Sequence, residues 1–195
     1  MIRKPVDTGY TTVQTCWVSI MAFEIVCYPD PILKKRSAPV EAIDDALRHR
    51  IEEMFSALYR ERGVGLAAPQ VGWSVRIFIA NTTGEPDPAT ERVYINPKII
   101  LAEGEIRDEE GCLSFPDIRG TVTRSQRVIV RAQDLRGEFF EEDATDLAAR
   151  AIQHELDHLD GILFISRLSL ADRLLVNKAL KKLEKEFKAH TARAR

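Results

Sequence analysis

Two histidines and a glutamate stand at a spacing that suits metal-dependent hydrolysis. In the stretch Gln153–Gly161, three residues separate His154 from His158, so on a helix both rings lie on one face and can bind one metal ion. Glu155 is turned about 100° from His154, which places its carboxylate beside a metal-bound water rather than on the ion. The pattern predicts a hydrolase in which Glu155 handles the proton of the attacking water. The alternative is an amphipathic helix with surface histidines, which the apolar neighbours on the same face disfavour.

A catalytic site of this type uses three protein ligands and one open position. An extended motif with a third histidine is excluded because position 164 is Phe. Glu184 and Glu186 follow on a later helix, but they lie among lysines and are expected to be solvated charges. A thiolate such as that of Cys112 is a strong ligand for a borderline or soft ion, yet a free cysteine is as often a small buried apolar residue. The residues alone leave both interpretations of Cys112 open.

The elements that position these residues follow from hydrophobic periodicity. We expect a helix over 42–62 that ends at Gly63, and the histidine-bearing helix over 145–160 with Gly161 as its stop. Strands are predicted over 75–80, 93–101 and 121–132, with a Gly/Pro-rich loop over 81–91 and a hairpin turn at 134–137. Ser169 and Asp172 resemble a capping pair for a last helix. The predicted class is α+β, with mixed or antiparallel strands packed around a central metal-binding helix and with a C-terminal helix.

The composition is that of one ordinary globular domain. The chain has 195 residues, 45% of them hydrophobic and 30% charged, and no apolar run approaches the length that spans a bilayer. Three cysteines form a sparse, odd set, which favours a reducing, cytoplasmic location over a disulfide framework. We expect an N-terminal extension over 1–20 with Met21 as an alternative start, a catalytic domain over 21–168, and a basic helix and tail over 169–195. Neither a membrane nor DNA is expected as a partner.

Three separate blocks carry a family resemblance. Gly63-Val64-Gly65-Leu66-Ala67-Ala68-Pro69-Gln70, Glu110-Gly111-Cys112-Leu113-Ser114 and Gln153-His154-Glu155-Leu156-Asp157-His158 resemble, in order and separation, the signature motifs of bacterial peptide deformylase. The resemblance implies a hydrolase that removes the formyl group from the N-terminal methionine of newly synthesised polypeptides and releases formate. It also implies that Cys112, His154 and His158 hold one divalent ion. Iron(II) is the expected ion in the cell, although the same ligands accept zinc, nickel or cobalt.

The resemblance assigns further roles around the ion. Metal-bound hydroxide would attack the formyl carbon, with Glu155 as general base and then acid. Gln70 and the backbone N–H of Leu113 would stabilise the oxyanion. Val64 and Gly65 suit a strand edge where a peptide could pair through its main chain. The remaining candidates for the substrate side are Glu110, Arg119, Leu147 and Ala151.

These last four residues have separate expected roles. Leu147 and Ala151 share the helical face of His154 and would line an apolar methionine pocket. Arg119 would lie near the mouth of that pocket, unless it is simply a solvated charge. We expect a basic partner such as Arg124 to hold Glu110 and so orient the loop of Cys112.

The charge of the chain is unevenly distributed. From Arg167 to Arg195 there are nine Lys or Arg and three acidic residues, a formal charge of +6, whereas the whole chain carries −2. A solvated helix face is one explanation, and docking to ribosomal RNA near the exit tunnel is the other. Two competing functions also fit the His-Glu-x-x-His motif: a metallopeptidase, and a non-catalytic binding module stabilised by a metal.

Overall fold

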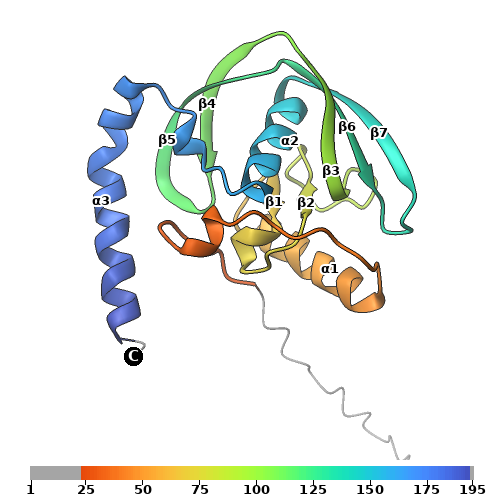
Figure 1. Ribbon diagram of the computed structural model, residues 1–195, viewed down its shortest axis with the longest axis horizontal. Helices are drawn as coiled ribbons and strands as arrows, with labels where there is room; N and C mark the ends of the chain where they lie inside the picture. Colours follow the sequence, from red (N-terminus) through yellow and green to blue (C-terminus); the bar gives the residue numbers. More distant parts are fainter. Residues whose placement is uncertain (1–22, 194–195) are drawn as a thin grey trace, which may run out of the picture.

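The computed structural model describes residues 23–193, so the expectations for residues 1–20 lie outside the described part. Helix α2 (Asp146–Leu159) lies at the centre, between a five-stranded sheet and a two-stranded hairpin (Figure 1). All pairs of named strands are antiparallel, and the predicted α+β class with a central helix is confirmed. The sheet contains, in spatial order, β1 (Gly65–Ala67), β2 (Ile77–Ala80), β3 (Arg92–Glu103), β6 (Arg127–Gln133) and β7 (Phe139–Thr145). The hairpin consists of β4 (Ile106–Cys112) and β5 (Phe115–Arg124).

Helix α1 (Asp45–Arg60) forms where the sequence predicts a helix, with slightly shorter bounds. The carboxylate of Asp44 caps it by accepting a hydrogen bond from the N–H of Leu47 at 2.8 Å. The helix ends close to Gly63, as predicted: the N–H of Gly63 bonds the carbonyl of Leu58 at 3.0 Å, while the left-handed residue is Arg62, with φ 55°. Gly63 is needed for a different reason: a Cβ there would lie 2.8 Å from Leu58 Cδ1.

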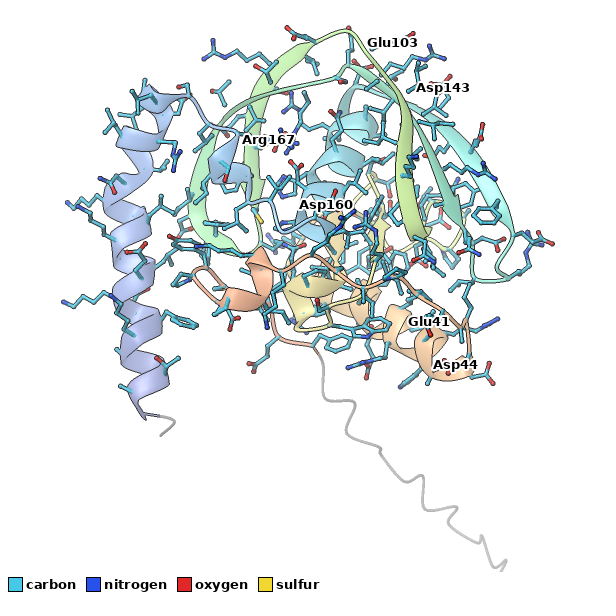
Figure 2. All side chains as sticks on the ribbon, viewed as in Figure 1. Glu41, Asp44, Glu103, Asp143, Asp160 and Arg167 are labelled. Carbon is cyan, nitrogen blue, oxygen red and sulfur yellow. The ribbon has the colours of Figure 1, made fainter. Side chains whose placement is uncertain are left out.

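Helix α2 packs one face on the sheet and turns the other toward the hairpin. Ala149, Ile152 and Leu159 are fully or nearly fully buried against apolar residues of β2, β3, β6 and β7. The helix ends before Gly161, which adopts φ 72° as predicted for a C-terminal glycine. Beyond it, Arg76 donates a hydrogen bond to Asp160 at 2.7 Å, and Figure 2 shows Asp160 at this end of α2.

The single strand predicted over 121–132 is wrong, because the chain leaves one sheet and enters the other at Ser125 and Gln126. The side chain of Gln153 on α2 explains the break. Its amide accepts a hydrogen bond from the N–H of Ser125 at 3.0 Å and donates one to the carbonyl of Ser125 at 2.9 Å. The backbone of Ser125 therefore pairs with a helix side chain where a continuous strand would pair with a neighbour.

Helix α3 (Leu170–Arg193) packs along β5 at the margin of the molecule (Figure 1). Ser169 and Asp172 form the predicted capping pair, with hydrogen bonds of 2.7 and 3.1 Å. Glu184 differs from its expected role as a solvated charge, because it accepts a hydrogen bond from the hydroxyl of Tyr28 at 2.7 Å. Short 3₁₀ segments complete the described chain: η1 (Pro31–Lys34), η2 (Ala68–Val71) and η3 (Phe164–Ser166). None of the helices between residues 23 and 193 is long and apolar enough to cross a membrane.

Alanine substitutions at two glycines, Gly161 and Gly84, can test how closely the end of α2 approaches the segment around Lys34. Gly161 and Gly84 both have positive φ values, 72° and 74°, so alanine at either site is expected to cost roughly 1–2 kcal/mol in backbone strain. A Cβ at Gly161 would also lie 2.5 Å from the carbonyl oxygen of Lys34, whereas nothing lies within 4 Å at Gly84. Urea denaturation should show that Gly161→Ala loses about 1–3 kcal/mol more than Gly84→Ala. An equal loss of stability in the two variants would mean that the backbone near Lys34 moves away from the new Cβ at position 161 without cost.

Candidate metal centre

The central helix and the hairpin bring Cys112, His154 and His158 together. Cys112 Sγ lies 3.2 Å from His158 Nε2, and the ligand atoms of all three residues lie within 4.8 Å of one another. Metal–sulfur and metal–nitrogen bonds of about 2.3 and 2.1 Å at tetrahedral angles require separations of this order. The two histidines are 8% and 1% exposed. One sulfur and two imidazoles therefore fit a single borderline divalent ion.

Cys112 is held by the tight turn that joins β4 to β5. The strand register shifts between Gly111 and Cys112, so that Cys112 pairs with Phe115. The N–H of Tyr28 binds the carbonyl of Ser114 at 2.9 Å, which anchors the turn from outside the hairpin. The position of the thiol is thus fixed by the backbone on both sides of it.

Gln70 connects the glycine-rich block to this turn. Its carbonyl oxygen accepts a hydrogen bond from the N–H of Ala67 at 2.9 Å. Its amide nitrogen consequently points toward Ser114 Oγ at 3.2 Å and Cys112 Sγ at 3.5 Å. Gln70 and Ser114 are 1% and 0% exposed, so this donor is oriented before any ligand arrives.

Glu155 lies in an enclosed position next to β1. Its side chain is buried, and among the described residues Oε2 has no hydrogen-bond partner. Burial raises the pKa of Glu155 to about 7. A Cβ on Gly65 would lie 2.6 Å from Glu155 Oε1, so a glycine is required where β1 passes the carboxylate. Such a group can take up and release a proton near neutral pH.

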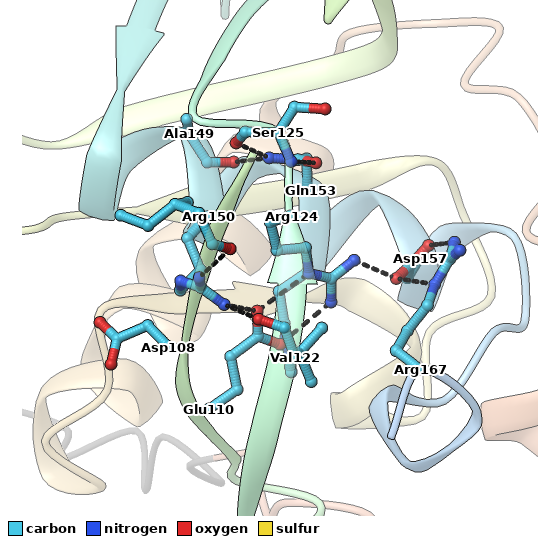
Figure 3. A network of polar contacts seen from close by, with 12 residues as sticks. Asp108, Glu110, Val122, Arg124, Ser125, Ala149, Arg150, Gln153, Asp157 and Arg167 are labelled. Carbon is cyan, nitrogen blue, oxygen red and sulfur yellow. Dashed lines mark hydrogen bonds and ion pairs between the residues drawn. The ribbon is translucent and has the colours of Figure 1, made fainter. Parts of the chain in front are cut away.

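Glu110 is surrounded by donors (Figure 3). The predicted partner, Arg124, binds it through Nε and Nη2 at 2.9 and 3.0 Å. Arg150 donates to it at 2.6 Å, and His154 Nδ1 lies 3.0 Å from its other oxygen. Burial alone would raise the pKa of Glu110, but the hydrogen bonds from His154 and Arg124 hold it well below its usual range.

The surroundings of Glu110 bear on its expected role on the substrate side. Both of its oxygens face protein donors, so the geometry fits the orientation of His154 better than contact with substrate. Arg150, one of these donors, is itself only 6% exposed. Its guanidinium also binds the carbonyls of Val122 and Ile106.

The other candidate residues are more dispersed. Ala151 is buried on α2, whereas Leu147, one turn earlier, is 52% exposed, so the apolar face opens toward solvent at the start of the helix. Val64 is half-buried next to β1. Leu113 is also half-buried and packs against the apolar core that includes the buried residues of α1. Arg119 is exposed and pairs with Glu109 at 3.3 Å. Among these residues Leu147 and Arg119 are exposed, Val64 and Leu113 are half-buried, and Ala151 is buried.

Sequence reasoning missed a set of buried ion pairs behind the ligands. Asp157 binds Arg124 and Arg167, and all three lie on different elements. Asp157 stands inside the third motif, between Leu156 and His158, but nothing in its spacing points to Arg124 or Arg167. Ser114, which shares the amide of Gln70 with Cys112, was missed as well.

Three converging ligands beside a buried carboxylate define a site of the metal-dependent hydrolase class. A family model for polypeptide deformylase matches residues 22–174. The peptide deformylase of Acidobacterium capsulatum is 46% identical over 166 residues, which are 85% of this chain and 98% of that protein. The chain belongs to the polypeptide deformylase family, as its three motifs predicted.

Solved structures agree with this assignment. The Plasmodium falciparum peptide deformylase is 39% identical with a TM-score of 0.83, and the match covers 85% of this chain and 98% of that one. For the peptide deformylase of Legionella pneumophila the identity is 41% and the TM-score 0.77, covering 87% and 97% of the two chains.

The raised pKa of Glu155 predicts a pH-dependent stability difference in the metal-free protein. With a folded-state pKa of about 7 against an ordinary value of 4.5, the folded protein between these pH values retains a proton that the unfolded chain has lost. The contribution of Glu155 to the free energy of unfolding therefore falls between about pH 4.5 and 7, by up to about 3 kcal/mol. Glu155→Gln removes this loss, so its stability relative to wild type should be greater at pH 8 than at pH 5. Urea denaturation at both pH values measures the difference, and a pH-independent difference would contradict the shift.

Proposed function

We propose that this chain hydrolyses the formyl group from the N-terminal methionine of newly synthesised polypeptides, with Glu155 as the proton carrier. Membership of the deformylase family supports the activity. The observation that carries the role of Glu155 is its buried carboxylate, with one oxygen unpartnered among the described residues, directly after the ligand His154 in the chain. The products are formate and a polypeptide with a free amino terminus.

Cys112, His154 and His158 would hold one divalent ion. When bound, the ion supplies Lewis-acid chemistry, lowering the pKa of a water toward neutrality and polarising the formyl carbonyl. We propose iron(II) as the ion in the cell, with zinc, nickel or cobalt also accepted. Family resemblance supports iron, because the sulfur and nitrogen donors themselves do not select among these ions.

Glu155 can serve both halves of the reaction. It first accepts a proton from the water that adds to the formyl carbon, and it then delivers that proton to the departing amine nitrogen as the C–N bond breaks. A carboxylate with a pKa of about 7 is neither too acidic to accept the proton nor too basic to release it. The backbone of β1 runs close to the carboxylate at Gly65, where an added Cβ would lie 2.6 Å from Oε1.

Gln70 and Leu113 are proposed to bind the negative charge that develops on the formyl oxygen. The bond from Ala67 to the Gln70 carbonyl leaves the NH₂ group facing the Cys112 turn. The backbone N–H of Leu113 follows Cys112 directly in the same turn. Donors fixed in advance stabilise such a charge without having to reorganise.

The substrate chain is proposed to extend along β1. This strand is at the margin of the sheet, and within residues 23–193 it pairs only with β2. The carbonyl of Val64 already accepts a hydrogen bond from the N–H of Asn81 at 2.9 Å, so of Val64 and Gly65 it is Gly65 whose main-chain groups face away from β2 and can pair with an extended peptide. Leu147 and Ala151 would contact the methionine side chain, and Arg119 would lie nearer the mouth. Glu110 would act indirectly, through His154.

Helix α3 is the proposed contact with the ribosome. Its apolar side packs on β5, which leaves its lysines exposed: Lys178, Lys181, Lys182, Lys185 and Lys188. A phosphate-rich surface fits this charge. Co-sedimentation with ribosomes should weaken steeply with salt and with glutamine at these positions, and salt-insensitive binding would contradict the proposal.

A cytoplasmic location is proposed as well. The free thiols of Cys27 and Cys112 support it, because such thiols persist in a reducing compartment.

Formate release from formyl-Met-Ala-Ser tests the function. Wild type should release formate, and Glu155→Gln should reduce kcat by about 100-fold or more, because a neutral amide cannot accept the proton. Metal content, measured after anaerobic preparation, should be equal in both proteins. Full metal occupancy without formate release by wild type would indicate a binding module. Cleavage of internal peptide bonds would indicate a peptidase.

Gln70→Ala isolates the oxyanion donor. Loss of one oriented donor is expected to lower kcat by about 100-fold, with a smaller effect on KM. Gln133→Ala is the matched control, because Gln133 hydrogen-bonds Asn96 and Gly137 away from the metal centre. A kcat within about threefold of wild type would remove Gln70 from the mechanism.

A further inference from the structure

We propose that Asp157 and Arg167 are positioning residues that fix the orientation of the ligand His154 from outside the metal centre. They do so through a continuous series of charged contacts, Arg167–Asp157–Arg124–Glu110–His154, called here the charge relay. Figure 3 shows four of its members, Arg167, Asp157, Arg124 and Glu110, pointing toward one another from the segment after η3, α2 and the hairpin. The inference rests on the proposed metal-dependent function.

The outer contact joins Arg167 to Asp157 in a two-point geometry. Arg167 Nη2 donates to Asp157 Oδ1 at 2.6 Å, and Arg167 Nε donates to Asp157 Oδ2 at 3.1 Å. Two parallel bonds fix the plane of the carboxylate as well as its position. The side chain of Asp157 is 10% exposed and that of Arg167 is 45% exposed, so Arg167 is the end of the relay that reaches solvent.

The middle contact transmits this orientation to Glu110. Arg124 donates from Nη1 to Asp157 Oδ2 at 2.5 Å and from Nε and Nη2 to the two oxygens of Glu110. Its side chain is 4% exposed. The guanidinium of Arg124 is planar and rigid. Asp157 therefore fixes the orientation of this group, and the group in turn fixes the orientation of the Glu110 carboxylate.

The inner contact reaches the ligand itself. Glu110 Oε2 lies 3.0 Å from Nδ1 of His154. Engaging Nδ1 leaves Nε2 for an ion and fixes the rotation of the ring about its Cβ–Cγ bond. Displacement of Asp157 therefore changes the direction in which Nε2 points.

An independent contact connects the same outer segment to the same ring. Phe164 of η3 lies three residues before Arg167, and its ring centroid is 6.1 Å from that of His154. Phe164 is 1% exposed and also packs edge-on against Phe115 of β5. The segment after α2 thus constrains His154 by packing from one end and by charge from the other.

A matched pair of arginine variants tests the relay in the full chain loaded with cobalt(II). Arg167→Gln removes the outer contact. Arg127→Gln is the control, since Arg127 makes an equally bidentate bond with Asp143 at 2.8 Å on exposed strands. The readouts are the visible absorption bands of cobalt, its rate of loss to excess chelator, and kcat and KM for formyl-Met-Ala-Ser.

Arg167→Gln is expected to shift the cobalt bands, to release the ion about 10-fold faster than Arg127→Gln, and to lower kcat with little change in KM. Arg167→Lys, which retains the charge but not the two-point geometry, should restore part of the release rate. In an Asp157→Asn background, Arg167→Gln should have no further effect, because both changes break the same contact.

Three results would overturn the proposal. One is a cobalt spectrum and release rate of Arg167→Gln equal to wild type. The second is an equal change in Arg127→Gln, which would indicate general destabilisation. The third is additivity of the Asp157 and Arg167 changes. The spectrum and release rate do not depend on deformylase activity, so a wild type that binds cobalt normally but releases no formate would contradict the proposed function alone.

Discussion

The burial of the Glu110 carboxylate is the constraint on which the two halves of the metal centre depend. A carboxylate that is 5% exposed is strongly unfavourable unless its charge is balanced and its oxygens are hydrogen-bonded. Glu110 lies on β4, and its donors come from β5 and α2: Arg124, Arg150 and His154. Removing one of these donors would leave the buried negative charge of Glu110 without full compensation. The packing of the hairpin against α2 and the spacing of the ligands therefore have one common cause.

The chemistry and the proposed peptide path meet at the glycine-rich block. Gly65 is the residue at which β1 can approach Glu155, and five residues later Gln70 faces Cys112. A short strand and one 3₁₀ turn thus place the proposed peptide-binding edge, the proposed proton carrier Glu155 and the proposed oxyanion donor Gln70 next to one another. The block has no side chain larger than leucine before Gln70, because larger groups would fill the space that the approach of β1 requires.

The features that could be predicted from the sequence are those that depend on the spacing of residues close together in the chain. The face shared by His154 and His158, the stop at Gly161 and the cap at Ser169 all follow from helix geometry within a few residues. The motif order predicted the family. What failed depended on contacts across the fold: the pairing of Ser125 with Gln153 splits a strand that looks continuous by periodicity, and the burial of Arg150 follows from Glu110, forty residues earlier. The exposure of Leu147 was likewise not predicted, because the helical pattern does not encode which part of an apolar face is covered by the rest of the fold.

The five-stranded sheet has two dissimilar margins. One is β1, with the neutral sequence Gly-Leu-Ala, and the other is β7, in which Glu141, Glu142 and Asp143 are consecutive. Acidic side chains on a free strand discourage another chain from adding there. Addition of a further strand is therefore disfavoured at β7, whereas β1 carries no charge that opposes it. The two margins of one sheet thus differ in how they would receive an extended chain.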